Sequence, residues 1–321
     1  MECIFFTLKR DLKIYLFTLF LIYLFPKNHQ IRMSISSFDD KILAVTAYFP
    51  LQKSKHLKKD YLAWINNLLR VFQGPLVIFT NHEGSAFLKL IKKQFCILTM
   101  FSDPFSIPCM KNLSNEYERQ NKIDIEKKIH NKFMYAIWNS KICLVNEAKL
   151  LFPFFSFYMW IDIGSLREKH YYNISIPRGN LSDDLIALKF DILFACINNK
   201  INRFHDMTID FIEGGFFICS NQGVDLFYSE FWRIHNFLLQ KHIFVGKDQT
   251  LYNYLFFNSN YSIKILPLFA SQNCNKWFGF YSFISSTNVC NLTFQLFTKK
   301  QFLETTKVKD PTNVFGFDYL L

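Results

Sequence analysis

Two short runs of β-branched and aromatic residues, separated by one helical segment, constrain the fold most strongly. Residues Lys41–Phe49 (KILAVTAYF) have the pattern of a buried strand, and Leu76–Thr80 (LVIFT) repeats it. Between them, Leu57–Phe72 carries apolar residues at helical spacing and ends before Gly74-Pro75. A strand, a helix and a second strand joined by short turns predict the start of a parallel, doubly wound sheet.

The rest of the chain extends this alternation within one folding unit. The apolar segment Phe154–Ile161 (FFSFYMWI) is predicted to be the central strand, and Asp103–Glu126 a surface loop. Further helices are predicted over His82–Lys93, Asn131–Leu150, Leu226–Gln240 and Asp248–Phe257, and further strands over Cys96–Met100, Phe211–Cys219 and Tyr261–Leu266. We therefore expect an α/β fold with a Rossmann-type, mostly parallel sheet flanked by helices. It forms a single large domain over residues 33–298, followed by a polar tail over 299–321.

The first 32 residues have the features of a targeting segment with a polar stem. Lys9, Arg10 and Lys13 precede the apolar stretch Ile14–Phe25, which is shorter than the roughly 20 residues of a spanning helix. No small-residue cleavage site follows it, so a signal peptide and an uncleaved signal anchor are both open. An anchor would hold the protein on a membrane with its body in the Golgi or endoplasmic reticulum lumen. Translation from Met33 would instead give a cytoplasmic protein.

Asn-x-Ser/Thr sequons favour the luminal alternative, because they become glycan acceptors in the secretory pathway. The candidate acceptors are Asn112, Asn173, Asn180, Asn260 and Asn291.

The net charge of the chain indicates which kinds of partner it can bind. Lys and Arg outnumber Asp and Glu by 37 to 26, and the net charge of +11 favours anionic partners. Because the basic residues are scattered and no nucleic-acid-binding motif occurs, nucleic acid is not an expected partner.

The eight cysteines include no Cys-x-x-Cys pair, which argues against a structural zinc site. Cys96 with Cys109, and Cys274 with Cys290, are spaced for disulfides, with buried thiols as the alternative.

Three short segments carry the candidate site. Asp162 follows the central strand, where open α/β sheets bind ligands, and Gly164 lets the backbone approach one. Gly214 and Gly215 open another strand, where the main chain either passes close to a ligand or forms a β-bulge. Asp248 begins a helix. Capping of the next turn or helix is the simpler interpretation of both aspartates.

In their order along the chain, these segments resemble the HtrL/YibB family of glycosyltransferases. The matching strings are VTAYFPL at 45–51, LVIFT at 76–80, Trp138-Asn139 with Lys141, WIDIGSLR at 160–167, EGGFF at 213–217, VGKDQ at 245–249, and Trp277-Phe278. The resemblance covers roughly residues 41–285. It implies a GT-A-like fold that transfers a sugar from a nucleotide-diphosphate sugar to a glycan or glycolipid acceptor.

The resemblance also implies roles for individual residues. Asp162 matches the first carboxylate of the Asp-x-Asp motif that holds a divalent cation (Mn²⁺ or Mg²⁺) and the sugar diphosphate, and Asp248 matches an aspartate that faces the donor sugar or the acceptor. These two are the expected catalytic residues. The other residues expected to bind the donor are Thr46, Ala47, Tyr48, Gly164, Arg167, Gly214, Gly215, Lys247 and Gln249, while Trp277 and Phe278 are expected to bind the acceptor.

Two departures from the family pattern bear on the chemistry. The second motif position is Gly164, and no histidine follows His242 to complete a metal shell, so metal use stays open. Arg167 and Lys247 are expected to stabilise the departing diphosphate if no metal does. The same departures leave a catalytically inactive, GT-A-like glycan-binding or scaffolding protein as the alternative function.

Overall fold

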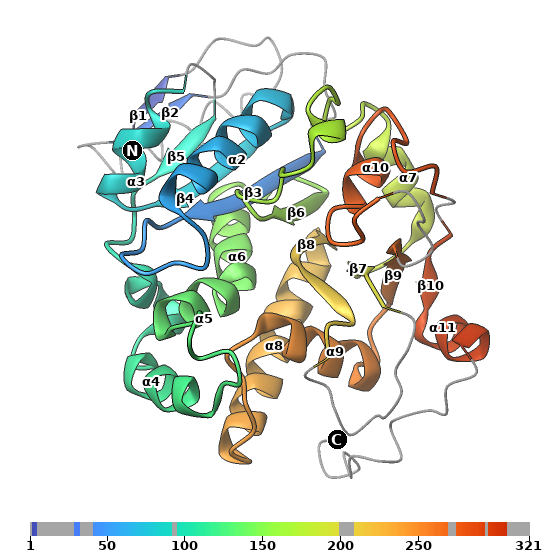
Figure 1. Ribbon diagram of the computed structural model, residues 1–321. Coiled ribbons are helices and arrows are strands. Elements are labelled where there is room, and N and C mark those ends of the chain that lie inside the picture. Colours follow the sequence, from blue (N-terminus) through green and yellow to red (C-terminus); the bar gives the residue numbers. More distant parts are fainter. Residues whose placement is uncertain are drawn as a thin grey trace.

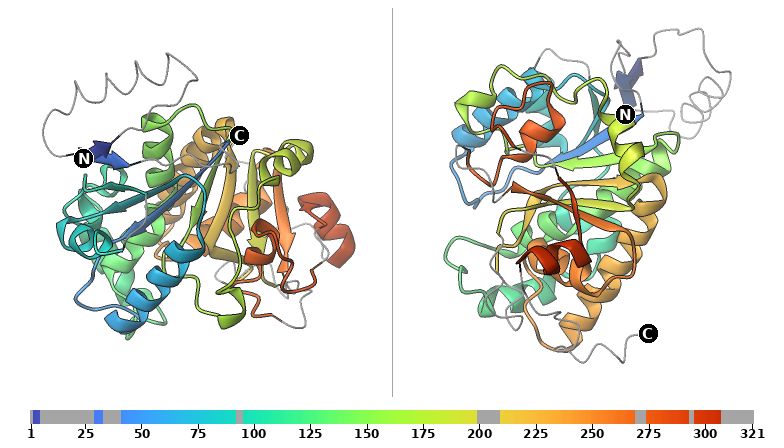
Figure 2. Two further views of the ribbon diagram at one scale, coloured as in Figure 1. Left: turned by 90° about the horizontal axis from the view of Figure 1, so that it is seen from above. Right: turned by 90° about the vertical axis from the view of Figure 1, so that its right-hand side faces the viewer.

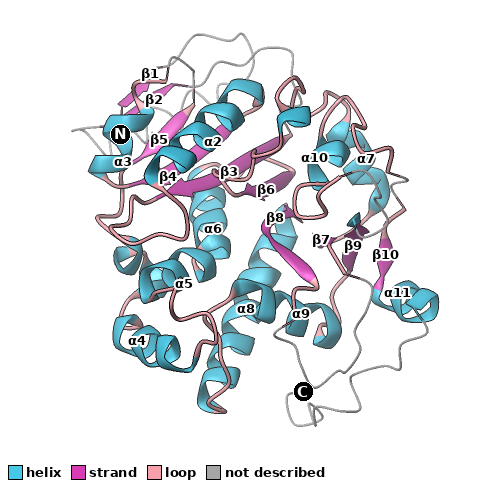
Figure 3. Cartoon of the chain, in the orientation of Figure 1, coloured by secondary structure: helices cyan, strands magenta, loops and turns pink. Residues whose placement is uncertain are grey.

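The computed structural model describes residues 2–4, 29–32, 41–91, 95–198, 209–268, 274–292 and 295–306. Its strands are β1 (Glu2–Ile4), β2 (His29–Arg32), β3 (Ile42–Tyr48), β4 (Leu76–Thr80), β5 (Cys96–Leu98), β6 (Phe157–Ile161), β7 (Ile192–Cys196), β8 (Ile212–Ser220), β9 (Ile263–Pro267) and β10 (Phe297–Thr298). Its helices are α2 (Lys58–Val71), α3 (His82–Leu88), α4 (Ser114–Ile123), α5 (Lys132–Asn139), α6 (Lys141–Leu151), α7 (Leu181–Leu188), α8 (Asn221–Gln240), α9 (Asp248–Asn258), α10 (Phe280–Ile284) and α11 (Lys299–Thr306). Figures 1 and 3 show their arrangement.

One eight-stranded sheet organises the domain, in the order β10-β9-β7-β8-β6-β3-β4-β5. Neighbouring strands run parallel except where β8 pairs with β6 and β7 and where β10 pairs with β9. The predicted α/β class, the mostly parallel sheet and the single domain are therefore confirmed. The chain moves from β3 to β4 and β5 on one side and later adds β6 on the other. Such a reversal of strand order opens a crevice at the carboxyl ends of the strands.

Both faces of the sheet are covered, which explains why its strands are continuous apolar runs. Strand residues alternate between the faces. Leu43, Val45 and Trp160 pack under α5, α6, α8 and α9, whereas Ala44 and Met159 pack under α2, α7 and α10. Figure 2 shows these helices on either side of the sheet.

Several elements differ from the sequence-based expectation. The segment expected to be a loop over Asp103–Glu126 contains α4, a polar helix that buries Tyr117 and Gln120. The expected helix Asn131–Leu150 is divided at Ser140, whose hydroxyl bonds to the Ile137 carbonyl instead of solvent. Helix α7 and strand β7 occupy a stretch for which the sequence pattern predicts no helix or strand.

The folded unit extends past the expected boundary at residue 298. Helix α11 lies in the segment predicted to be a tail, and its Phe302 is fully buried in the core. The ring of Phe302 lies 5.1 Å from that of Phe211 at the start of the β8 region. An aromatic residue in such a position joins the C-terminal helix to the core.

Two disulfides occur among the described cysteines. Cys274–Cys290 is confirmed, whereas the predicted pair of Cys96 with Cys109 is wrong, because Cys109 pairs with Cys143 instead. Cys96 lies inside β5 and is buried within the sheet, while Cys143 is on α6, which packs beside the turn that carries Cys109.

The N-terminal expectations fall largely outside the described residues. The apolar stretch Ile14–Phe25 is not among them, and β1 and β2 form a small parallel sheet on their own. Within the described part of the chain, no helix is both long and apolar enough to cross a membrane.

Candidate active site

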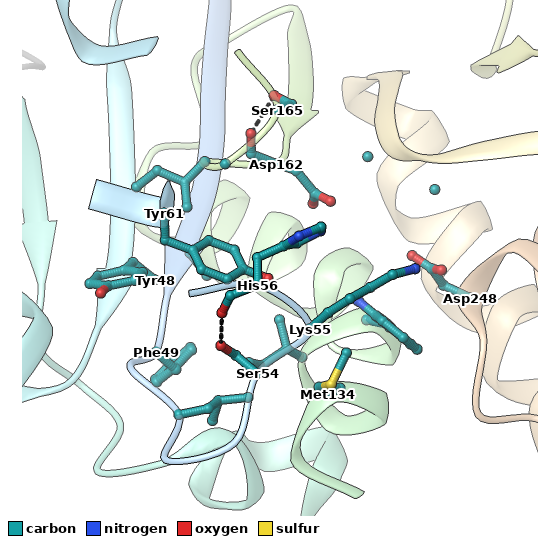
Figure 4. A pocket seen from close by; sticks show the side chains of 18 of the residues that line it. Tyr48, Phe49, Ser54, Lys55, His56, Tyr61, Met134, Asp162, Ser165 and Asp248 are labelled. Atoms are coloured by element: carbon teal, nitrogen blue, oxygen red, sulfur yellow. Dashed lines mark hydrogen bonds between the residues drawn. The ribbon is translucent and has the colours of Figure 1, made fainter. Parts of the chain in front are cut away.

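A large cavity lies at the sheet edge where the parallel strands end. Its volume is about 1060 Å³, and it is lined by the segment after β3, the turn after β6, the first residues of β8, the start of α9 and residues 275–278. In Figure 4, Tyr48, Tyr61 and His56 lie on one side and Asp248 on the other, with the Asp162 carboxylate directed into the space between them. A crevice at this edge is the usual ligand site of open α/β sheets.

The position of Asp162 follows from the pairing of β6 with β8. Ile161, the last residue of β6, faces Phe216, and the next backbone N–H, of Asp162, donates to the Gly215 carbonyl at 2.8 Å. The indole N–H of Trp160 donates to Oδ1 of Asp162 at 2.7 Å. The Asp162 side chain is 38% exposed, so its carboxylate is open to the cavity.

Lys141 joins this carboxylate to a second one. Its ammonium nitrogen lies 3.2 Å from Oδ1 of Asp162 and 2.8 Å from Oδ2 of Asp248, and it donates to the Gly214 carbonyl at 2.8 Å. The Lys141 side chain is 3% exposed and that of Asp248 is 5% exposed. Burial acts to lower the pKa of Lys141, but Asp162 and Asp248 outweigh it, so the pKa is raised and Lys141 is charged.

The two consecutive glycines of β8 are required by this packing. A Cβ on Gly214 would lie 2.9 Å from Oδ1 of Asp248, and one on Gly215 would lie 2.8 Å from Oε1 of Glu213. The glycine pair therefore lets β8 pass directly against the carboxylates. The pairing of β7 with β8 also shifts register over this stretch, between Phe194–Phe217 and Cys196–Ile212, so a bulge-like irregularity accompanies the close approach.

Glu213 is a third acidic group in the same place. Its Oε1 accepts a hydrogen bond from the Gly215 N–H at 2.8 Å, while its Oε2 is buried without a partner among the described residues. Burial, reinforced by the nearby Asp162 carboxylate, raises the pKa of Glu213 to about 8. Near neutral pH Glu213 therefore keeps its proton, and Lys141 balances two carboxylates rather than three.

Arg167 is held rigidly beside the cavity by aromatic rings. Its guanidinium lies 4.1 Å from the ring centre of Trp64 and 5.5 Å from that of Phe278. Its Nε donates to the Gly164 carbonyl at 2.9 Å, and Nη1 lies 3.2 Å from the His56 ring. Burial, with Arg167 as the next contribution, lowers the pKa of His56. His56 therefore stays neutral and leaves the positive charge with Arg167.

A second polar group stands at another wall of the cavity. Lys247 forms an ion pair with Glu126, and this hydrogen bond lowers the Glu126 pKa. His130 Nδ1 lies 2.8 Å from Oδ2 of Asp124, which also accepts a hydrogen bond from Tyr135 at 2.6 Å. Asp124 thus orients the buried His130 ring.

Most of the predicted site residues meet in this one cavity. Those that line it are Ala47, Tyr48, Asp162, Gly164, Arg167, Gly214, Gly215, Lys247, Asp248, Gln249, Trp277 and Phe278. Thr46 does not, because it is fully buried within β3. Tyr48 is also largely buried and packs edge-on against Phe87, so packing accounts for much of this ring.

The residues around Asp162 do not fit a divalent cation. Its Oδ1 is already bonded to Trp160 and faces the Lys141 ammonium, which would repel an ion on the same carboxylate. Asp162 belongs to neither group of three metal-binding side chains that the described residues contain, which are Asp124, Glu126 and His130, and His170, Cys274 and Cys290. In the second group both cysteines are consumed by the disulfide.

Sequence reasoning did not assign several of these groups. The family resemblance contains Lys141 and Glu213 within its matching strings but predicts no role for either. A signal for Lys141 was present, because it follows Met134 and Trp138 at helical spacing on the face that meets the cavity. The remaining missed residues are His56, Tyr61, Glu126 and His130.

A scan against protein-family models finds no match for this chain. A search of curated proteins likewise finds no similar sequence. The resemblance to the HtrL/YibB family therefore stays a prediction.

Proposed function

We propose that the protein is a GT-A-like glycosyltransferase, which moves a sugar from a nucleotide-diphosphate sugar to a glycan or glycolipid acceptor. The observation that carries this proposal is the convergence of Asp162, Lys141 and Asp248 in one cavity at the carboxyl edge of the sheet. The cavity volume of about 1060 Å³ suits a ligand larger than a single sugar.

Positive charge around the opening fits a diphosphate. Lys53 and Lys55 are exposed on the segment after β3 and line the cavity together with Arg167 and Lys247. Fixed cations stabilise the negative charge that develops on a departing diphosphate. In this proposal Arg167 contacts the diphosphate. Its guanidinium packs against the rings of Trp64 and Phe278, so the side chain needs little reorganisation when the ligand binds.

The two aspartates take different parts. Asp162, the more exposed, contacts the donor, as the family resemblance implies. Asp248 is nearly enclosed and bonded to Lys141, so we assign it to holding the site in shape and orienting the groups that meet the acceptor hydroxyl. Trp277 and Phe278 are partly buried and line the same cavity. Their rings offer an aromatic surface for an acceptor sugar.

Thermal unfolding of the full chain with UDP-sugars, GDP-sugars and the free nucleoside diphosphates tests the proposal. A ligand that binds only the native state raises the unfolding midpoint. We expect one nucleotide class to do so, Asp162→Asn to abolish the shift, and Asp210→Asn, an exposed aspartate of the same cavity, to retain it. No shift with any nucleotide, together with binding to immobilised glycans, would instead support the inactive, glycan-binding alternative.

We also propose a luminal location with the N-terminal segment as the membrane anchor. All five sequon asparagines are exposed, and two disulfides are typical of an oxidising compartment. Expression in a eukaryotic secretory system followed by glycosidase treatment should increase the electrophoretic mobility of the protein. Unchanged mobility would favour the cytoplasmic product that starts at Met33.

A further inference from the structure

Lys141 is an unusual residue for the interior of an α/β domain. It lies on α6 beneath the cavity, almost completely buried. An ammonium group has three N–H donors, and three oxygens lie within 3.2 Å of this one: Oδ1 of Asp162, Oδ2 of Asp248 and the Gly214 carbonyl. Buried lysines are rare unless they are paired in this way.

We propose that the Lys141 ammonium is a built-in cation that occupies the place between Asp162 and Asp248 where a divalent metal would otherwise bind, so that the cavity takes a nucleoside diphosphate without metal. The nucleoside diphosphate in this proposal rests on the function proposed above. The position of the Lys141 cation is independent of that function, because it can be tested with a metal ion alone.

The charges around the ammonium explain why the site needs a cation. Asp162 and Asp248 bring two negative charges to one end of the cavity, and the protonated Glu213 adds none. Left unbalanced, these carboxylates would repel a diphosphate. Lys141 neutralises one of these charges, and the Arg167 guanidinium interacts electrostatically with Asp162. The two cations together reduce the repulsion that an anion would meet at this end of the cavity.

Removing the lysine side chain should create a metal site. Lys141→Ala would leave two carboxylates and a carbonyl oxygen around a vacant space, which is the oxygen-rich environment that Mn²⁺ and Mg²⁺ prefer. The control is Lys149→Ala, two turns further along α6, whose ammonium pairs with Asp225 at the surface and makes no contact with Asp162 or Asp248.

The experiment titrates Mn²⁺ alone into the full chain and follows the free ion by electron paramagnetic resonance. We expect Lys141→Ala to gain one Mn²⁺ site at least about tenfold tighter than any in the wild type or in Lys149→Ala. Adding Asp162→Asn to Lys141→Ala should abolish that site. Tight Mn²⁺ binding by the wild type that depends on Asp162, or a folded Lys141→Ala with no gain, would overturn the proposal.

Lys141→Ser leaves the same vacant space and serves if the alanine variant does not fold. If neither variant folds, the wild type decides the question, because its nucleotide affinity should differ by less than about twofold between Mn²⁺ and chelator. A strict requirement for Mn²⁺ would refute the built-in cation. Absence of any nucleotide binding would count against the glycosyltransferase, while the Mn²⁺ titration of the variants would still judge the position of the cation.

Discussion

The indole N–H of Trp160 reaches past the end of β6 and donates to Oδ1 of Asp162 at 2.7 Å. The Trp160 ring itself is buried in the core, stacked at 6.4 Å from Phe217 of the neighbouring β8. The side chain that fills the core under the sheet therefore also fixes the carboxylate that faces the cavity.

Trp160→Phe is expected to lower the free energy of unfolding by about 2–4 kcal/mol, because it removes a hydrogen bond to a charged group and leaves a void. Nucleotide affinity should fall as well, since Asp162 loses its support. Trp232→Phe is the matched control, because the Trp232 indole N–H has no partner among the described residues. Urea unfolding measures both variants, and equal losses would contradict the special role of the Trp160 bond.

Gly214→Ala should destabilise the protein by about 1–3 kcal/mol, since its new methyl group would lie 2.9 Å from Oδ1 of Asp248 and must displace it. Gly179→Ala is the control, because a Cβ there meets nothing within 4 Å. Urea unfolding should separate the two variants. A Gly214→Ala variant as stable as Gly179→Ala would show that β8 can move away from Asp248 at little cost.

Glu213 should make stability fall as the pH rises. Its folded-state pKa of about 8 lies above the ordinary value of 4.5, so between these values the native state holds a proton that the unfolded state has lost. The contribution of Glu213 to unfolding free energy then falls by about 1.4 kcal/mol per pH unit over this window and levels off above pH 8. Glu213→Gln should be less sensitive to pH in urea unfolding from pH 5 to 9, and equal slopes would contradict this assignment.

Reduction of the disulfides should lower stability by about 3 kcal/mol for Cys274–Cys290, which closes a loop with a sequence separation of 16, and by somewhat more for Cys109–Cys143, with a separation of 34. Thiol titration of the unfolded, unreduced chain should find no more than four thiols, since four of the eight cysteines belong to the two disulfides of the described residues. Eight titratable thiols would mean that neither bridge forms.

Phe302→Ala should cost about 3–5 kcal/mol, because the side chain is fully buried against Phe211. Ile125→Ala should have little effect, because Ile125 is 94% exposed. Thermal unfolding of both variants checks the result. If Phe302→Ala proves neutral, the C-terminal helix does not contribute to the core and the expected boundary at residue 298 is restored.

The sheet was largely predictable from sequence, whereas the helices around it were less so. Strands β3 and β4 are buried on both faces and therefore appear as continuous apolar runs. Helix α4 was missed because its sequence is polar, and its burial of Tyr117 depends on neighbours that are distant in the chain. The Cys109–Cys143 bridge was missed for the same reason.

The candidate site was predictable where it follows from strand ends. Asp162 could be placed because a carboxylate after a buried strand lies at the ligand edge of the sheet. Helical spacing could place Lys141 on the face that meets the cavity, but its burial could not be predicted, because a lysine is normally a surface residue and only the tertiary positions of Asp162 and Asp248 make its burial favourable. Local patterns thus locate the edge of the sheet, and the charge balance there depends on contacts between distant segments.

The enclosed ammonium also has a consequence for the order in which the chain folds. Helix α6 forms from local contacts, but docking Lys141 against the sheet before β6, β8 and the start of α9 are in place would bury an unpaired charge. The chain therefore gains little from assembling one half of the domain alone. Docking of α6, β6, β8 and the start of α9 around Lys141 is therefore expected to be coupled.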